Sequence, residues 1–313
     1  MTQEQHYSVL LQESVSALVL NPDGFYVDGT FGRGGHARAI LAQLSDKGRL
    51  LAFDKDPSAV SAARSLEQED ARFEIVHGSF TLIEQTLRDR EIKADGLLLD
   101  LGVSSPQLDE AERGFSFMRD GPLDMRMNTD EGLSAEAWLR ETAPADMAKV
   151  FKEFGEERFA RKIALAIAEQ RKDKPLTTTL ALANLIESVV PKKEQQKHPA
   201  TRVFQAIRIE INKELDDLRA VLDASLKVLR PGARLVVISF HSLEDRIVKR
   251  FLKKYSQSQD FPLGVPVTHD KLKAPLKLIG RAGKAGREEL EENVRSRSAI
   301  MRIAEIEDLV KEG

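Results

Sequence analysis

The stretch "FYVDGTFGRGGH", residues Phe25–His36, joins an apolar strand to a glycine-rich turn. The apolar run ends in Asp28, and four glycines fall within the next seven residues. Glycine lets the chain turn sharply and lets the backbone approach a ligand closely. Because ligands of open α/β sheets bind at the carboxyl ends of the strands, this turn is the first candidate binding site.

The first hundred residues continue the alternation of apolar strands and helices. We expect strands at residues 24–28, 48–54, 71–78 and 94–102, and helices at residues 35–44, 57–68 and 80–90. Strands that are apolar almost throughout, separated by helices, are typical of a parallel sheet covered on both faces. The sequence therefore predicts an α/β fold.

The alternation stops after residue 104 and returns near the C-terminus. Residues 134–190 show only helical patterns, and a long helix is expected from residue 198 to about residue 229. Buried strands are then expected at residues 231–240 and 298–305. We interpret the chain as one sheet domain, residues 1–104 and 213–313, interrupted by an inserted all-helical domain, residues 105–212.

Composition excludes several classes of protein and site. The chain has 313 residues, 42% hydrophobic and 31% charged, with a net charge of −3. It contains no cysteine, which excludes disulfides, thiolate metal ligands and a cysteine nucleophile. The six histidines are scattered, so no metal site is expected. No apolar run approaches the roughly 18 residues of a membrane helix, and the N-terminus lacks a basic signal region, so a cytoplasmic location is expected.

Three interpretations of the glycine turn compete on the residues alone. Gly32, Gly34 and Ala37 match the dinucleotide fingerprint loosely, and Asp54 ends the next strand where an acid can bind a ribose, which fits NAD. S-adenosylmethionine carries an ammonium group and no phosphate, so an acid at the end of the first strand, Asp28, favours it. The third interpretation is a tight turn that binds nothing.

Longer stretches favour one family. They are "HYSVLL", "DGTFGRGGH", "LDLGVSSPQLDEAERGFSFMRDGPLDMRM", "GEERFARKIA", "HPATRVFQAIRIEIN" and "ISFHSLEDRIVKRF". Through them the sequence resembles the bacterial 16S ribosomal RNA (cytosine-N4)-methyltransferase family along its whole length, least clearly at residues 254–292. The resemblance implies a Rossmann-like class I methyltransferase sheet and S-adenosylmethionine as cofactor. It also implies methylation of a cytidine N4 in the decoding region of 16S rRNA, within the small ribosomal subunit.

The resemblance also assigns roles to individual residues. It implies cofactor contacts by Gly34, Gly35, His36, Asp54, Phe80, Asp100 and Gln107. Asp54 is the expected ribose ligand and Phe80 the expected neighbour of adenine. Cytosine N4 is a poor nucleophile because its lone pair is delocalised into the ring, so the site needs acceptors for the two N–H bonds. We expect these acceptors from Asp100 and from the segment Ser104, Ser105 and Pro106.

RNA contacts are expected from two places. The helix after residue 198 carries a polar face beside its apolar stripe, and the segment from Arg246 to Arg297 has thirteen Lys and Arg against six Asp and Glu. Ser242 and Asp245 predict the start of a helix that buries Leu243, Ile247 and Phe251 and exposes its cations. The expected RNA contacts are Arg202, Arg208, Asn212, Lys249 and Arg250.

The sequence leaves open the role of a smaller group of residues and two alternative functions. One of Phe115, Phe117, Met118, Met125 and Met127 can stack on a base, but most are expected in packing. An NAD-dependent oxidoreductase would use the same fold, and a non-catalytic RNA-binding assembly factor would use the same surfaces. The sequence does not distinguish a monomer from a homodimer.

Overall fold

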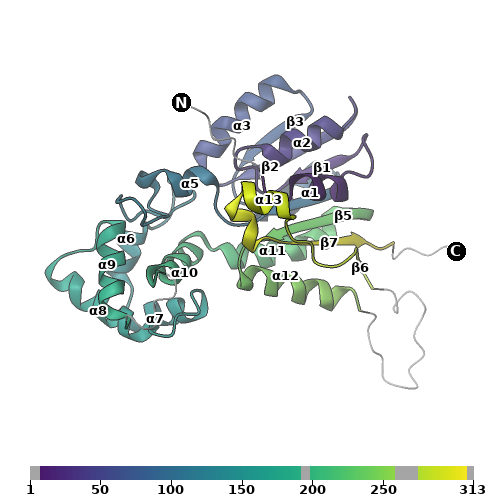
Figure 1. The fold of residues 1–313 in the computed structure, drawn as a ribbon. Coiled ribbons are helices and arrows are strands. Elements are labelled where there is room, and N and C mark those ends of the chain that lie inside the picture. The colour runs from purple at the N-terminus through teal and green to yellow at the C-terminus, as the bar shows by residue number, and fades with distance from the viewer. Residues whose placement is uncertain (1–7, 192–197, 258–273, 309–313) are drawn as a thin grey trace, which may run out of the picture. The chain divides into compact units, whose positions relative to one another are not determined.

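The computed structural model describes residues 8–191, 198–257 and 274–308, which form two compact units (Figure 1). Unit 1 combines residues up to Gly102 with residues from Leu215 onward, and unit 2 is Val103–Glu214. The domain boundaries expected from the sequence, at residues 104 and 213, each lie two residues from these positions. The inserted segment thus forms a unit with its own core.

Unit 1 contains a seven-stranded sheet with the strand order β3-β2-β1-β4-β5-β7-β6. The strands are β1 Phe25–Asp28, β2 Arg49–Asp54, β3 Phe73–His77, β4 Ala94–Asp100, β5 Leu229–Ser239, β6 Leu276–Leu278 and β7 Ile300–Ile306. The first five strands run parallel, whereas β7 is antiparallel to both of its neighbours. The chain moves outward from β1 to β3 and then returns to β4. The strand order therefore reverses between β1 and β4, where ligands of such sheets bind.

Helices cover both faces of this sheet (Figure 1). They are α1 Leu11–Leu18, α2 Gly35–Gln43, α3 Pro57–Glu69, α4 Ile83–Asp89, α11 Glu214–Val228, α12 Ser242–Tyr255 and α13 Arg287–Glu292. Successive strand residues point to opposite faces. Accordingly, Tyr26 packs with residues of α1, α2 and α3, and Val27 packs with residues of α4, α11 and α12.

Unit 2 is helical, as the sequence predicted for residues 134–190. Its helices are α5 Ser105–Asp109, α6 Ala135–Glu141, α7 Pro144–Glu153, α8 Ala160–Asp173, α9 Thr179–Val189 and α10 Ala200–Asn212. Fully buried side chains from α7, α8, α9 and α10, among them Phe151, Ile163, Ile186 and Ile207, form its core. Within the described part of the chain, no helix is long and apolar enough to cross a membrane.

Three details of the secondary-structure prediction are wrong. The expected long helix is interrupted at Lys213, whose φ of 53° is left-handed and ends α10. α12 is capped by His241 instead of Ser242: Nδ1 of His241 accepts from the N–H of Glu244 at 3.4 Å, since an imidazole nitrogen can replace a hydroxyl as acceptor. On the same helix Val248 is fully buried and Ile247 only partly, while Leu243 and Phe251 are buried as predicted.

Candidate active site

Three aspartates end three neighbouring strands of unit 1. Asp28 ends β1, Asp54 ends β2 and Asp100 ends β4, and these strands lie side by side in the order β2-β1-β4. The side chain of Asp28 is fully buried, whereas that of Asp100 is 23% exposed. Because the carboxyl ends of parallel strands meet at one edge of the sheet, the three carboxyl groups share that edge.

Asp54 holds the glycine loop in place. Its Oδ2 accepts a hydrogen bond from the N–H of Gly32 at 2.7 Å, and its Oδ1 accepts from the N–H of Asp56 at 2.8 Å. Gly32 and Gly34 have φ of 55° and 76°, in the left-handed region that favours glycine. Asp54 therefore ties the turn after β1 to the end of β2, in addition to any contact with a ligand.

His36 lies inside this site and does not face solvent. Only 4% of the residue is exposed, and its Nδ1 lies 3.5 Å from Oδ2 of Asp100. Burial lowers the pKa of His36 to about 4, so the imidazole is neutral at pH 7. The preceding residue, Gly35, leaves no room for a side chain, because a Cβ there would collide with the hydroxyl of Ser8.

Thr30 connects the two acids of β1 and β4. Its N–H donates to Oδ1 of Asp28 at 3.0 Å, and its hydroxyl oxygen lies 3.5 Å from the same atom. That hydroxyl also accepts a hydrogen bond from the backbone N–H of Asp100 at 2.7 Å. Sequence reasoning missed Thr30, although its place in the quoted stretch, two residues after Asp28, was a usable signal.

Several polar atoms at this edge have no hydrogen-bond partner among the described residues. They are Oδ2 of Asp28, Oδ1 of Asp100, Nε2 of His36 and, at the end of β5, Oγ of Ser239. Buried polar atoms without partners are uncommon in folded proteins, and each costs free energy. Their concentration at one edge therefore marks a place where a ligand with hydrogen-bond donors fits.

The charges of the site favour a cationic ligand. Burial, with a smaller contribution from nearby Asp54, raises the pKa of Asp28 to about 7. Burial, Asp28 and Glu244 together raise the pKa of Asp100 well above its usual value. Burial likewise raises the pKa of Asp54 to about 6. A positively charged group placed here would relieve the repulsion between these acids, and the ammonium and sulfonium groups of S-adenosylmethionine meet that requirement.

A second group of side chains lies after β2 and β3. Phe80 is partly buried in a short 3-10 turn, Phe80–Leu82, and its Cβ lies close to Gly29, directly after β1. Ser79 Oγ donates to Oδ2 of Asp217 at 2.8 Å, and Nζ of Lys55 lies 2.5 Å from the same oxygen. These contacts fix the turn that carries Phe80. No sequence motif predicted the link to Asp217.

Residues 104–107 belong to unit 2 and form the start of α5. Gln107 is buried, and its Oε1 accepts from the N–H of Ser104 at 2.9 Å in a capping box, with Pro106 in the first turn. The local structure thus gives Gln107 a role in shaping the segment. Its expected contact with the cofactor, and that of Ser104–Pro106 with the amine, stay predictions.

Two of the five expected RNA residues have internal partners. Arg208 forms a two-bond ion pair with Glu214, both at 2.8 Å. Asn212 is buried, accepts from the N–H of Met127 at 2.7 Å and donates to the carbonyl of Met125 at 2.8 Å. Asn212 supports the loop before α6, and Arg208 is tied to the first residue of α11. Their expected contacts with RNA stay predictions. Arg202, Lys249 and Arg250 are exposed.

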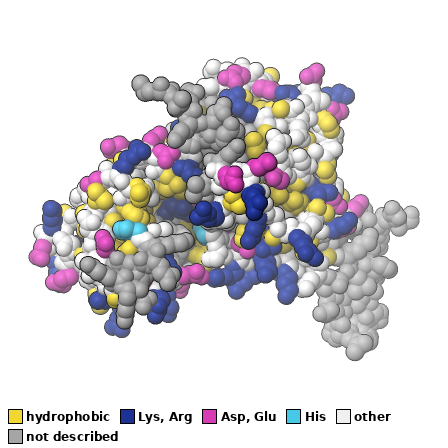
Figure 2. Space-filling model, viewed as in Figure 1, with side chains coloured by type: hydrophobic (Ala, Val, Ile, Leu, Met, Phe, Trp, Pro, Cys, Tyr) yellow, Lys and Arg dark blue, Asp and Glu magenta, His cyan; other side chains and the backbone are white. Residues whose placement is uncertain are grey.

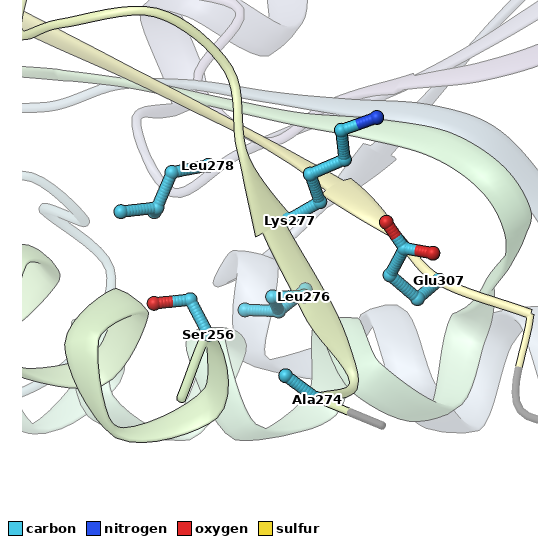
Figure 3. A pocket seen from close by; sticks show the side chains of 6 residues that line it. All are labelled: Ser256, Ala274, Leu276, Lys277, Leu278 and Glu307. Atoms are coloured by element: carbon cyan, nitrogen blue, oxygen red, sulfur yellow. The ribbon is translucent and has the colours of Figure 1, made fainter. Parts of the chain in front are cut away.

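A separate cavity of about 450 Å³ lies at the other end of unit 1 (Figure 3). The residues that line it are Ser256, Ala274, Leu276, Lys277, Leu278 and Glu307. They come from the end of α12, the edge strand β6 and the segment after β7. None of them belongs to the ends of β1, β2 or β4, so the cavity is not part of the three-aspartate site.

Several methylases are among the solved structures that are similar to this chain. A protein of Clostridium thermocellum assigned as an rRNA-methylase is 10% identical, with 96% of this chain and 99% of that chain covered and a TM-score of 0.45. An rRNA methylase of Streptococcus thermophilus is 10% identical, with 95% and 93% covered and a TM-score of 0.42. NSun6 of Pyrococcus horikoshii, solved with SFG, is 13% identical, with 97% and 53% covered and a TM-score of 0.42.

The sheet, with helices on both faces and acids at the strand ends, together with the methylase family match, defines a Rossmann-like class I methyltransferase, a class whose cofactor is S-adenosylmethionine. Within that class the chain belongs to the MraW methylase family, whose profile matches residues 3–307. The family resemblance found in the sequence is therefore confirmed. Membership in a methylase family also opposes the oxidoreductase alternative.

Proposed function

We propose that this methyltransferase methylates the exocyclic N4 of a cytidine in the decoding region of 16S rRNA, within the small ribosomal subunit. The observation that carries the proposal is the pair of buried carboxyl groups, Asp28 and Asp100, with unpartnered oxygens at the point where the strand order reverses. The long match of "LDLGVSSPQLDEAERGFSFMRDGPLDMRM" to the cytosine-N4 family supplies the substrate.

The proposed cofactor residues are those that the family resemblance implies. They are Gly34, Gly35, His36, Asp54, Phe80, Asp100 and Gln107. The two glycines let the backbone approach the ligand. Neutral His36 places Nδ1 3.5 Å from Oδ2 of Asp100, and its Nε2 has no partner among the described residues. Asp54 already accepts two backbone N–H groups, but each carboxylate oxygen has a second lone pair that can accept a ribose hydroxyl.

The chemistry requires acceptors and orientation more than a strong base. S-adenosylmethionine, when bound, supplies an electrophilic methyl group. Asp100 keeps Oδ1 without a partner among the described residues, so it can accept an N–H bond of the cytosine amine. We assign the other acceptors to Ser104, Ser105 and Pro106. Correct placement of amine and methyl contributes about 7–11 kcal/mol in favourable cases, and the proton can leave after attack.

Phosphate contacts are assigned to exposed cations in each unit. Arg202 supplies one in unit 2, and Lys249 and Arg250 supply two on α12 of unit 1. Figure 2 shows Lys and Arg side chains gathered over the region of α12. The two acids near the start of this helix are occupied: Glu244 is buried, and Asp245 pairs with Arg302 at 2.7 Å. The exposed charges of α12 are therefore all positive, which suits a phosphate backbone.

The test is methyl transfer to small ribosomal subunits, followed by digestion of the rRNA to nucleosides and mass spectrometry. We expect one N4-methylcytidine per subunit with the wild-type protein and none with Asp100→Asn under the same conditions. Methylation of another nucleoside would refute the cytosine-N4 assignment. Tight binding to subunits without any transfer would favour the alternative of a non-catalytic assembly factor, which acts in the same cytoplasmic compartment.

A further inference from the structure

Three aromatic rings in unit 2 form a continuous stack from its core to its surface. The ring of Phe117 lies 4.9 Å from that of Phe204, edge to face, and 4.5 Å from the imidazole of His198, with an angle of 33°. Phe204 is 4% exposed, Phe117 is partly buried and His198 is exposed. We call these three residues the aromatic stack. Its outermost member offers ring surface to the solvent.

The imidazole at the outer end of the stack is held in one orientation. Nδ1 of His198 accepts a hydrogen bond from the N–H of Ala200 at 3.2 Å, and one face of the ring rests on Phe117. A neutral imidazole with Nδ1 as acceptor carries its proton on Nε2. A ring that is already fixed loses little conformational freedom when a flat partner stacks on it.

Exposure sorts the apolar residues of the neighbouring segment into two groups. Phe115 is 7% exposed and Met125 is fully buried, so both serve packing, as most of this group was expected to. Met118, directly after Phe117, is 83% exposed, which is unusual for a large apolar side chain. Arg202 is exposed four residues after His198. The outer end of the stack is thus a fixed ring, and an exposed thioether and an exposed cation lie near its members in the sequence.

We propose that His198, at the outer end of the aromatic stack, binds one unpaired nucleobase of the substrate RNA, that Met118 adds an apolar contact to this base, and that Arg202 contacts an adjoining phosphate. This rests on the proposed function, which supplies an RNA substrate. A nucleobase is flat and matches a single exposed ring. A protein partner requires roughly 800 Å² on each side for a stable interface, far more than one imidazole and one methionine offer.

Single-stranded RNA is recognised mainly by stacking of splayed bases on aromatic rings, and the contact tolerates different bases because each has a π face. The contribution of one such stack corresponds to a change in affinity of about 5- to 150-fold. The two exposed residues can be removed without opening the core, because Phe117 and Phe204 stay in place.

The experiment compares the wild-type protein with His198→Ala/Met118→Ala. The probe is a single-stranded RNA oligonucleotide that contains 2-aminopurine, whose fluorescence is quenched by stacking. We expect the double variant to bind about 5- to 150-fold more weakly and to quench less, and His198→Phe, with Met118 retained, to keep wild-type quenching. The matched control is Leu165→Ala, an equally truncating change at a residue of α8 that is 54% exposed.

The outcomes separate this proposal from the proposed function. Wild-type quenching and affinity in the double variant would overturn the base-binding role, as would binding of a duplex in preference to the single strand. Loss of quenching in the variant supports that role even if the wild-type protein methylates no rRNA, a result that would refute only the proposed function. Thermal unfolding of each variant verifies that unit 2 remains folded.

Discussion

The hydroxyl of Thr30 accepts a hydrogen bond from the backbone N–H of Asp100 at 2.7 Å. Thr30 follows β1 and Asp100 ends β4, so this bond fixes the two strand ends against each other at the point where the strand order reverses. Because the backbone N–H of Thr30 also donates to Oδ1 of Asp28, one residue contacts both Asp28 and the backbone of Asp100. Thr30 therefore acts through these acids.

Replacement of Thr30 by Val should lower the stability of the site and its affinity for the cofactor without abolishing cofactor binding. Val keeps the shape of Thr but leaves the N–H of Asp100 without its acceptor, which costs about 1–3 kcal/mol in the free energy of unfolding. We also expect weaker binding of S-adenosylmethionine, measured by calorimetry. Thr30→Ser retains the hydroxyl and should restore both values. If Thr30→Val binds the cofactor as the wild type does, Thr30 does not position the acids.

The raised pKa of Asp28 predicts a dependence of stability on pH. Its pKa is about 7 in the folded protein against 3.8 for an exposed Asp, so the folded state binds more protons between about pH 4 and pH 7. The contribution of Asp28 to the free energy of unfolding is therefore fully present below pH 4 and lost as the pH rises through 7. Asp28→Asn should remove this decline, which thermal unfolding from pH 5 to pH 8 measures.

The same protonation should couple to cofactor binding. A cationic ligand favours the ionised form of Asp28, so affinity for S-adenosylmethionine should rise as the pH rises through about 7. Calorimetry in buffers with different ionisation enthalpies should detect protons released on binding below that pH. Proton release that is the same in Asp28→Asn as in the wild type would assign the effect to another group.

Six of the seven strands of the sheet were predicted because each contains an apolar run, whereas the three-residue strand β6 was not predicted. Hydrophobic periodicity reports burial but not direction, so it could not predict that β7 is antiparallel. It also could not predict the left-handed Lys213, because one residue of this kind leaves the helical pattern on both sides intact. Among site residues, motifs identified Asp54, His36 and Asp100, whereas the link through Asp217 joins positions far apart in sequence.

The sequence could not show which polar side chains of α10 have partners inside the protein. Arg208 and Asn212 share the polar face of the helix, and a sequence cannot show that their partners, Glu214 and the backbone of residues 125 and 127, lie within reach. A polar side chain beside an apolar stripe satisfies buried backbone groups as readily as it lines a cleft. Only the exposed Arg202 retains the position expected of an RNA contact on that helix.

Asp54→Ala should lower the affinity for S-adenosylmethionine by about 1.5–3 kcal/mol, the loss expected for charge-assisted hydrogen bonds to a ribose. The variant also removes the acceptor of the Gly32 N–H, so a second measurement must separate the ribose from the loop. A 2′-deoxy analogue of S-adenosylhomocysteine should bind the wild type more weakly than the parent compound. Asp54→Ala should bind the analogue and the parent compound equally. If the variant still binds the analogue more weakly, Asp54 does not contact the ribose.

Charge reversal on α12 tests the phosphate assignment. Lys249→Glu with Arg250→Glu should weaken binding to small subunits and reduce its salt dependence, because fewer counterions are released. Affinity for S-adenosylmethionine should be unaltered. The control is Lys47→Glu with Arg88→Glu, which changes net charge equally at two other exposed positions of unit 1. An equal loss in both variants would mean that only overall charge matters.

The variant Asp100→Asn tests the residue beside which the cofactor and the reacting amine are proposed to bind. Asn keeps the size of Asp and one acceptor oxygen but has no negative charge, and the backbone N–H of Asp100 can still donate to Thr30. Removal of one preorganised polar contact of this kind lowers the rate of other enzymes by about 10²–10³. We therefore expect a loss of methyl transfer of that order, with the unfolding free energy little changed or increased, because a buried repulsion from Asp28 is relieved.

Single-turnover methylation of small subunits at saturating cofactor, with cofactor affinity measured in parallel, distinguishes the two roles of this carboxyl group. A slow transfer step with normal affinity would show that Asp100 acts on the cytosine amine through its unpartnered Oδ1. Weak affinity with a normal saturated rate would show that it holds the cationic end of the cofactor, beside neutral His36. If both the transfer rate and the cofactor affinity match the wild type, Asp100 has no role in the reaction. The acceptors for the amine would then be the backbone groups of Ser104–Pro106.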